Sequence, residues 1–200
     1  MRHPRVAAAA LVGALFSATL FAAGPALAAA PSGGGIGPGG DLDAESCAEF
    51  TRYGPLDIEL TGIPEPVVAG EWTEFTYRVT NTYDHPVDRL YAFVELGAYD
   101  TSGGADIAVK AQRFAHGAWR PLGAIPEADP EEGPHFPYLG RTGALDPGES
   151  AEARLRIRVH GGAPEGALGT AGLAATWADD ATGVCESTVT DLEFDVAAAG

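Results

Sequence analysis

GALDPGESAEARLRIRVHGGAPEG (residues 143–166) alternates apolar and polar side chains between two turn-forming segments, Asp146–Glu149 and Gly161–Pro164. Alternation with period two is typical of a β-strand with one buried face, because successive side chains point to opposite faces of a sheet. The predicted inward side chains are Ala151, Ala153, Leu155, Ile157 and Val159. The predicted outward side chains are Glu152, Arg154, Arg156, Arg158 and His160.

The three arginines of this outward face lie in a chain whose formal net charge is -16. An antiparallel neighbour that carries Glu74, or one that carries Glu193 and Asp195, would form cross-strand ion pairs with them. Each such pair contributes a fraction of a kcal/mol, and charge rows also protect a sheet against edge association. These arguments favour ion pairing. The alternative is a docking face for an acidic ligand or polymer.

Short alternating runs bounded by Gly, Pro, Asn and Asp recur after residue 45. This pattern predicts an antiparallel, all-β domain. Further strands are predicted at residues 56–60, 72–81, 90–97, 107–114, 118–122, 168–177 and 184–196. Ala115–Gly117 indicates a hairpin, and Trp177 is expected in the core. Val67–Val68 is predicted to continue the first run as an edge strand kinked at Pro64 and Pro66.

The first 28 residues have the order of a secretory signal peptide. Arg2 and Arg5 give a basic start, residues 6–23 form an apolar run, and Ala26–Ala28 supplies an A-x-A cleavage site. A transmembrane anchor is the competing interpretation, but the run is short and alanine-rich, and no positive cluster follows it. We therefore expect export with removal of residues 1–28.

Cleavage would remove two arginines and no acid, so the net charge would fall from -16 to -18. Such a surface repels phosphate and anionic lipid, which argues against nucleic-acid binding and against membrane insertion after cleavage. Residues 29–46 are rich in Gly, Pro and Ser and are predicted to form a flexible leader. Residues 47–196 are predicted to be one domain, and residues 197–200 a short tail.

Cys47 and Cys185 are the two cysteines of the chain. An even pair in an exported protein predicts one disulfide, which would stabilise the fold by up to about 5 kcal/mol in the chain-entropy model. Two free thiols, or a thiol that binds metal, are the alternatives.

No residue pattern for catalysis, metal or cofactor binding stands out. The G-x-S-x-G motif of a serine nucleophile is absent, and the histidines after residue 28 are isolated from one another, which argues against a zinc site. A dispersed catalytic triad and a catalytic pair of acids stay open as alternatives. Acidic stretches at residues 99–106 and 179–180 have the composition of a calcium loop but not its spacing. We predict no catalytic residue, no cofactor and no metal ligand.

Aromatic side chains near residues 121–137, a long loop rich in Pro and acid, suggest a contact surface. The candidate binding residues are Trp119, Arg120, Phe136 and Tyr138. A core-capping role for Trp119 is the alternative. The acidic loop at residues 126–137 also allows a different function, that of an extracellular enzyme or enzyme inhibitor.

Three segments carry a resemblance to a known family: Pro66–Glu71 leading into a strand that ends at Asn81, Leu145–Ser150 leading into Leu155–Val159, and Ala163–Gly166 before the closing pair of strands. They resemble the immunoglobulin-like modules of bacterial surface and secreted proteins, of the cell-adhesion-related (CARDB-like) kind. The leader and cysteine positions are similar to those of secreted actinobacterial proteins.

The resemblance implies a single immunoglobulin-like β-sandwich of about seven to nine strands. It also implies display, spacing or adhesion in place of catalysis, with a protein or cell-envelope component as the partner. The chain ends at Val196–Gly200 without a sorting motif, so we expect a secreted product that is released or held non-covalently at the cell wall.

Overall fold

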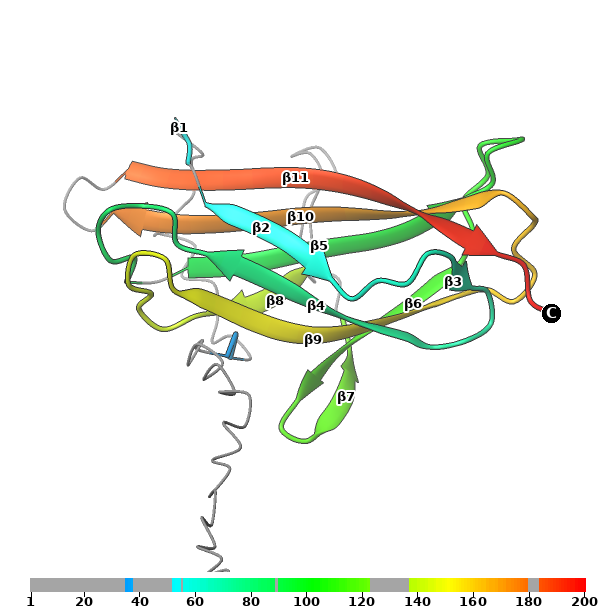
Figure 1. The fold of residues 1–200 in the computed structure, drawn as a ribbon, viewed down its shortest axis with the longest axis horizontal. Helices are drawn as coiled ribbons and strands as arrows, with labels where there is room; N and C mark the ends of the chain where they lie inside the picture. Colours follow the sequence, from blue (N-terminus) through cyan, green and yellow to red (C-terminus); the bar gives the residue numbers. More distant parts are fainter. Residues whose placement is uncertain (1–34, 38–51, 55, 89, 123–136, 180–183) are drawn as a thin grey trace, which may run out of the picture. The chain divides into compact units, whose positions relative to one another are not determined.

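The computed structural model describes residues 35–37, 52–54, 56–88, 90–122, 137–179 and 184–200. These residues form eleven strands and no helix, which confirms the all-β prediction. The strands make two sheets that pack face to face as a β-sandwich (Figure 1). Nine of the described strands have four or more residues, and the other two have two residues each.

The five-stranded sheet has the order β2–β4–β9–β6–β7, with every neighbouring pair antiparallel. Its strands are β2 (Asp57–Thr61), β4 (Thr73–Thr80), β9 (Ser150–Val159), β6 (Val109–Ala115) and β7 (Ala118–Pro121). Strand β9 is therefore central in its sheet and is covered on one face by the second sheet.

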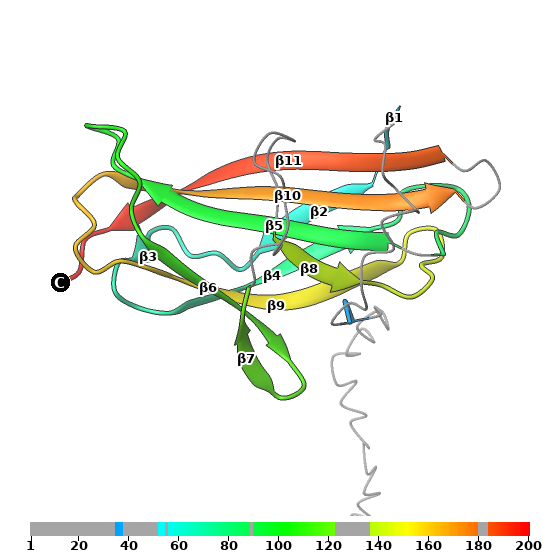
Figure 2. The same cartoon turned by 180° about the vertical axis from the view of Figure 1, so that it is seen from behind.

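The six-stranded sheet has the order β1–β11–β10–β5–β8, and β3 also pairs with β11 (Figure 2). Its strands are β1 (Arg52–Tyr53), β3 (Val67–Val68), β5 (Leu90–Tyr99), β8 (Tyr138–Arg141), β10 (Ala167–Asp179) and β11 (Val184–Ala197). The two short strands β1 and β3 run parallel to β11, whereas the other described pairs in this sheet are antiparallel.

Strand β3 is where the structure departs from the predicted edge strand. Val67–Val68 does not continue β2 but pairs with Val196 and Ala197 in the opposite sheet. The intervening residues include Pro64 and Pro66, which have no N–H for a strand ladder, so the chain leaves one sheet there and enters the other.

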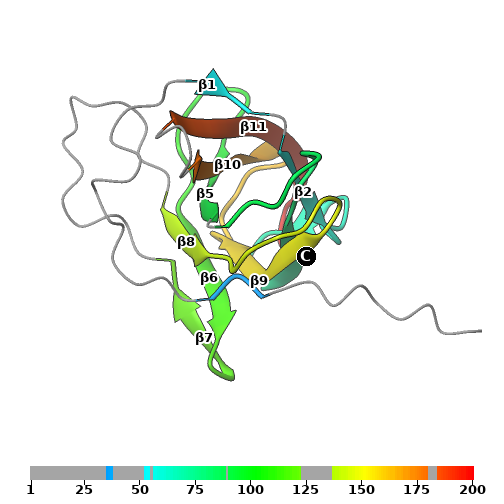
Figure 3. The ribbon, with the colours of Figure 1, turned by 90° about the vertical axis from the view of Figure 1, so that its left-hand side faces the viewer.

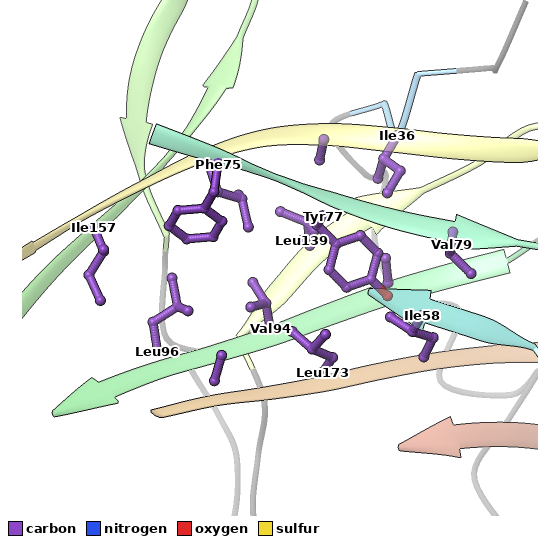
Figure 4. Close-up of a cluster of buried hydrophobic side chains, with 14 of the residues drawn as sticks. Ile36, Ile58, Phe75, Tyr77, Val79, Val94, Leu96, Leu139, Ile157 and Leu173 are labelled. Carbon is purple, nitrogen blue, oxygen red and sulfur yellow. The ribbon is translucent and has the colours of Figure 1, made fainter. Parts of the chain in front are cut away.

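The core lies between the sheets and is built by alternation (Figure 4). Phe75, Tyr77 and Val79 face inward from β4, as predicted, and all five predicted inward residues of β9 are buried. Val94, Leu96 and Leu173 face them from the six-stranded sheet. The Tyr77 hydroxyl also donates a hydrogen bond across the core to the Ala174 carbonyl, at 3.0 Å.

The β6–β7 hairpin confirms the predicted turn at Ala115–Gly117. His116 and Gly117 both have positive φ, of 51° and 75°, as a two-residue type I′ connection requires. This turn pairs Ala115 with Ala118 and brings Phe114 directly opposite Trp119. In Figures 1 and 2 the hairpin extends away from the body of the sandwich.

Three residues of the predicted leader belong to the fold. Ile36 is only 5 % exposed and packs in the core, while Gly35 and Gly37 form bridges with Glu152 and Arg141. Seen from the end of the sandwich, this segment lies between β8 and β9 (Figure 3). The prediction of a flexible leader outside the domain therefore does not hold for Gly35–Gly37.

Candidate functional site

The outward face of β9 carries the arginine row, as predicted, and Arg154 is paired with an acid. Its Nη2 lies 3.0 Å from Glu74 Oε2 on the neighbouring strand β4. The two side chains are 56 % and 52 % exposed, so this ion pair contributes less than about 1 kcal/mol. Glu193 and Asp195, the other predicted acids, lie on β11 in the opposite sheet and cannot reach the row.

Arg156 is held by aromatic rings in place of an acid. Its guanidinium carbon lies 4.3 Å from the Trp72 ring centroid and 4.4 Å from that of Trp119. Its Nε also donates a hydrogen bond of 2.8 Å to Gln112 Oε1 on β6. A guanidinium stacked on tryptophan gains about 0.5–1 kcal/mol per exposed contact and keeps its charge.

Arg154 extends the same stack. Its guanidinium carbon lies 4.7 Å from the Phe114 ring centroid and 5.5 Å from that of Trp119. Phe114 and Trp119 meet edge to face at 5.3 Å because the tight β6–β7 turn places them in register. We call Trp72, Phe114, Trp119, Arg154 and Arg156 the aromatic–arginine surface.

Arg158 continues the row beyond this surface and faces another cation. Lys110 on β6 is its partner in the strand register, and both side chains are exposed. Within the described part of the chain neither has an acid within 4.0 Å. Like charges directly opposite each other on neighbouring strands are destabilising. Because no described acid pairs with Arg158 or Lys110, the two side chains carry uncompensated positive charge.

The four candidate residues chosen from the sequence do not form one surface. Trp119 belongs to the aromatic–arginine surface and does not cap the core. Arg120, next on β7, points to the other face, in register with Arg113. Tyr138 lies on β8 in the other sheet, 5.5 Å from Phe93 between ring centroids. Phe136 is outside the described residues, as is the acidic loop up to residue 136.

Arg113 and Tyr138 contain the buried polar atoms that lack hydrogen-bond partners in the described residues, Arg113 Nε and the Tyr138 hydroxyl. Arg113 Nη2 donates to the Ile36 carbonyl at 3.1 Å, which ties the leader segment to β6. Burial lowers the pKa of the Arg113 guanidinium and raises the pKa of the Tyr138 hydroxyl. Both shifts favour the neutral forms, as expected for poorly solvated groups.

A second polar cluster lies at the end of the sandwich. Trp177, predicted to be a core residue, is 5 % exposed, and its Nε1 donates to the Tyr83 hydroxyl at 3.1 Å. That hydroxyl donates in turn to the Glu186 carboxylate, and the His85 ring packs against both aromatic rings. The cluster satisfies buried polar groups and anchors the loop after β4.

The acidic stretch at residues 99–106 is organised by its own hydrogen bonds. The Asp100 carboxylate accepts from the Ser102 N–H at 2.8 Å and from the Ser102 hydroxyl at 2.7 Å, and these bonds lower the pKa of Asp100. The described residues contain no group of three or more His, Cys, Asp or Glu placed to hold a metal ion. Calcium at this loop or at residues 179–180, the alternative to our prediction of no metal ligand, stays untested, and residue 180 lies outside the described residues.

The disulfide also stays a prediction, because Cys47 lies outside the described residues. The backbone of Cys185 lies in β11 opposite Ala178. Over the described ranges, the structure contains no helix that is long and apolar enough to span a membrane.

No family model matches the chain, and no curated protein matches it. Among solved structures it is similar to AvmM, which catalyses macrocyclization in alchivemycin A biosynthesis, with 16 % identity over 76 % of this chain and 96 % of AvmM and a TM-score of 0.49. It is similar to alpha-2-macroglobulin from Escherichia coli, with 15 % identity over 73 % of this chain and 17 % of that one and a TM-score of 0.42.

The major pilin subunit of Bacillus cereus, BcpA, is similar at 12 % identity over 72 % of this chain and 40 % of the pilin, with a TM-score of 0.35. Because these TM-scores all lie below 0.5, none of the likenesses bears on function. The class that the structure defines is that of a β-sandwich domain.

Proposed function

We propose that the chain is a non-catalytic, secreted immunoglobulin-like module with a binding, adhesion or structural role outside the cell. The strand order supports the immunoglobulin-like part of this proposal. In constant-type immunoglobulin domains a sheet of strands A–B–E–D faces a sheet of strands G–F–C. Here β2–β4–β9–β6 take the places of A–B–E–D, and β11–β10–β5 take those of G–F–C, in the same chain order. Strands β7 and β8 are insertions between D (β6) and E (β9). The resemblance to CARDB-like modules agrees with it.

The aromatic–arginine surface is the observation that carries a binding role. Its rings lie against the guanidinium groups of Arg154 and Arg156 on the outward face of a sheet, and these contacts restrict the two side chains before a partner binds. Arg158 and Lys110 add positive charge that no described acid neutralises. Ordered side chains lose little entropy on binding, so such a surface is suited to an acidic partner.

The proposal places the module outside the cell on the signal-peptide pattern of residues 1–28 and the even number of cysteines. The partner is a protein or cell-envelope component with acidic groups, and no nucleic acid is involved, because the net charge of -16 repels polyphosphate at long range. The role requires no cofactor.

Binding of the chain without residues 1–28 to isolated cell envelopes of the producing organism tests this proposal. The Arg156→Ala/Arg158→Ala variant should lose most of the bound fraction. Arg120→Ala/Arg141→Ala, which removes the same charge from two exposed arginines elsewhere, should bind like the original chain. Equal binding by both variants, with unfolding curves that show both are folded, would contradict a binding role for this surface.

A further inference from the structure

The outward face of the other sheet carries an acidic row. Asp191, Glu193 and Asp195 are exposed on β11, because Leu192, Phe194 and Val196 take the inward positions. Glu95 on β5 joins this face. These four carboxylates, Glu95, Asp191, Glu193 and Asp195, form the acidic row.

Two neighbours fix the shape of this row. Gly172 on β10 is the register partner of both Glu95 and Asp191, so only a residue without a side chain separates these two acids. The Tyr99 hydroxyl donates to Glu193 at 2.8 Å. No described cation lies within 4.0 Å of any acid of the row, which leaves its charge uncompensated.

The charges of the acidic row and of the arginine row have the same spacing along their strands. Both use alternate residues of one long strand, so their charges repeat at about 6.6–6.8 Å along the strand. Each row also has a further charge beside one of its members. Glu95 lies two strands from Asp191 on the acidic side, and Lys110 lies on the strand next to Arg158 on the basic side. One row can therefore lie along the other with opposite charges in contact.

We propose that the partner of the aromatic–arginine surface and of Arg158 and Lys110 is the acidic row of a second copy of this chain. The two rows lie on the outward faces of the two sheets, and hence on opposite sides of the sandwich. Contact between different patches on opposite sides is head-to-tail and does not close on itself, so the copies stack into open chains.

An apolar side chain beside the acidic row fits the same contact. Val189 is 43 % exposed and is the one large hydrophobic side chain that is exposed among the described residues. It lies on the outward face of β11, two residues before Asp191, and its register partner is Ala174. Opposite the aromatic–arginine surface of another copy, Val189 would meet aromatic rings while the acids meet the cations.

The net charge, which is -16 for the whole chain and -18 without residues 1–28, opposes this association at long range, because all copies repel one another. At physiological ionic strength the screening length is about 8 Å, which weakens repulsion between distant charges more than attraction between charges in contact. Attraction between the two rows in contact then offsets part of this repulsion.

Sedimentation velocity of the chain without residues 1–28 tests the inference. The unmodified chain should form species larger than dimers as its concentration rises. Lys110→Gln/Arg158→Gln and Asp191→Asn/Asp195→Asn each remove one side of the contact, and each variant alone should stay monomeric. An equimolar mixture of the two should form a 1:1 dimer and nothing longer, because each variant keeps one functional face.

Matched controls are Arg120→Gln/Arg141→Gln and Glu65→Gln/Glu165→Gln, which make the same charge changes at exposed positions outside both rows and should assemble like the original chain. A chain that stays monomeric up to about 1 mM, where an interaction of only about -4 kcal/mol populates the complex, would overturn the inference. Assembly that persists in either row variant would overturn it as well.

The inference rests on the proposed function only for the use of the aromatic–arginine surface. A monomeric chain that still binds cell envelopes through Arg156 and Arg158 would overturn self-association and leave the proposed function in place. A chain that neither assembles nor binds envelopes would overturn both.

Discussion

Replacing Tyr77 with phenylalanine tests the dry interior between the sheets. The Tyr77 side chain is 0 % exposed, and its hydroxyl donates to the Ala174 carbonyl of the opposite sheet at 3.0 Å. Phenylalanine keeps the ring and removes only this hydrogen bond. At pH 7 we therefore expect Tyr77→Phe to lower the free energy of unfolding by about 1 kcal/mol.

The same substitution should have the opposite effect at high pH. Burial raises the pKa of the Tyr77 hydroxyl far above its ordinary value of 10.0, whereas in the unfolded chain the hydroxyl ionises near that value. A folded pKa above the unfolded one contributes stability that is complete below pH 10 and is lost as the pH rises. At pH 11 ionisation of the unfolded chain costs about 1.4 kcal/mol of stability, which phenylalanine avoids.

The order of stabilities should therefore reverse: Tyr77→Phe is less stable by about 1 kcal/mol at pH 7 and more stable by about 0.4 kcal/mol at pH 11. Urea unfolding of both proteins at pH 7, 9, 10 and 11 measures this difference, and the contributions of other titrating groups cancel in it. A difference that stays constant across this range would show that Tyr77 ionises equally in both states, which refutes its burial in a dry core.

Substitutions at three further positions test packing. Gly169→Ala sets a Cβ against the ring of Phe194 on the neighbouring strand and should lower the free energy of unfolding by about 1–3 kcal/mol in urea titrations. Ile36→Ala should cost about 2 kcal/mol and Ile36→Val about 1 kcal/mol, and equal stability of all three proteins would place Ile36 outside the core. Arg156→Ala should cost about 1–2 kcal/mol and change tryptophan emission, whereas Arg156→Lys, which lacks the planar group, should restore little of either.

Strand positions and their inward faces could be predicted from the sequence because both depend on local alternation. The inward residues of β9 and the inward side of β4 are buried as expected, and the β6–β7 hairpin lies at the predicted turn. Each of these predictions needs only a window of about ten residues in which one face must leave water. Local periodicity is enough for such features.

Partners across strands could not be predicted in the same way. Alternation assigns Glu74, Glu193 and Asp195 equally to outward faces, but only pairing in three dimensions places the first beside β9 and the others on the opposite sheet. Val67–Val68 was open to the same ambiguity, because a two-residue apolar pair fits the edge of either sheet. Ile36 stands alone among glycines, and a single apolar residue has no periodicity from which burial could be predicted.

The aromatic–arginine surface lies between these two cases, because part of it follows from the alternation of inward and outward side chains along β4. With Phe75, Tyr77 and Val79 turned inward on β4, Trp72 falls in the outward set together with Glu74. A tryptophan assigned to an outward face, where no second layer covers it, needs a different partner for its ring. Alternation does not say which strand lies beside β4, so the contact of Trp72 with the Arg156 guanidinium on β9 follows only from the pairing of these two strands. An acid at the same place would neutralise the arginine, whereas an aromatic ring orders the arginine and leaves its charge for a partner.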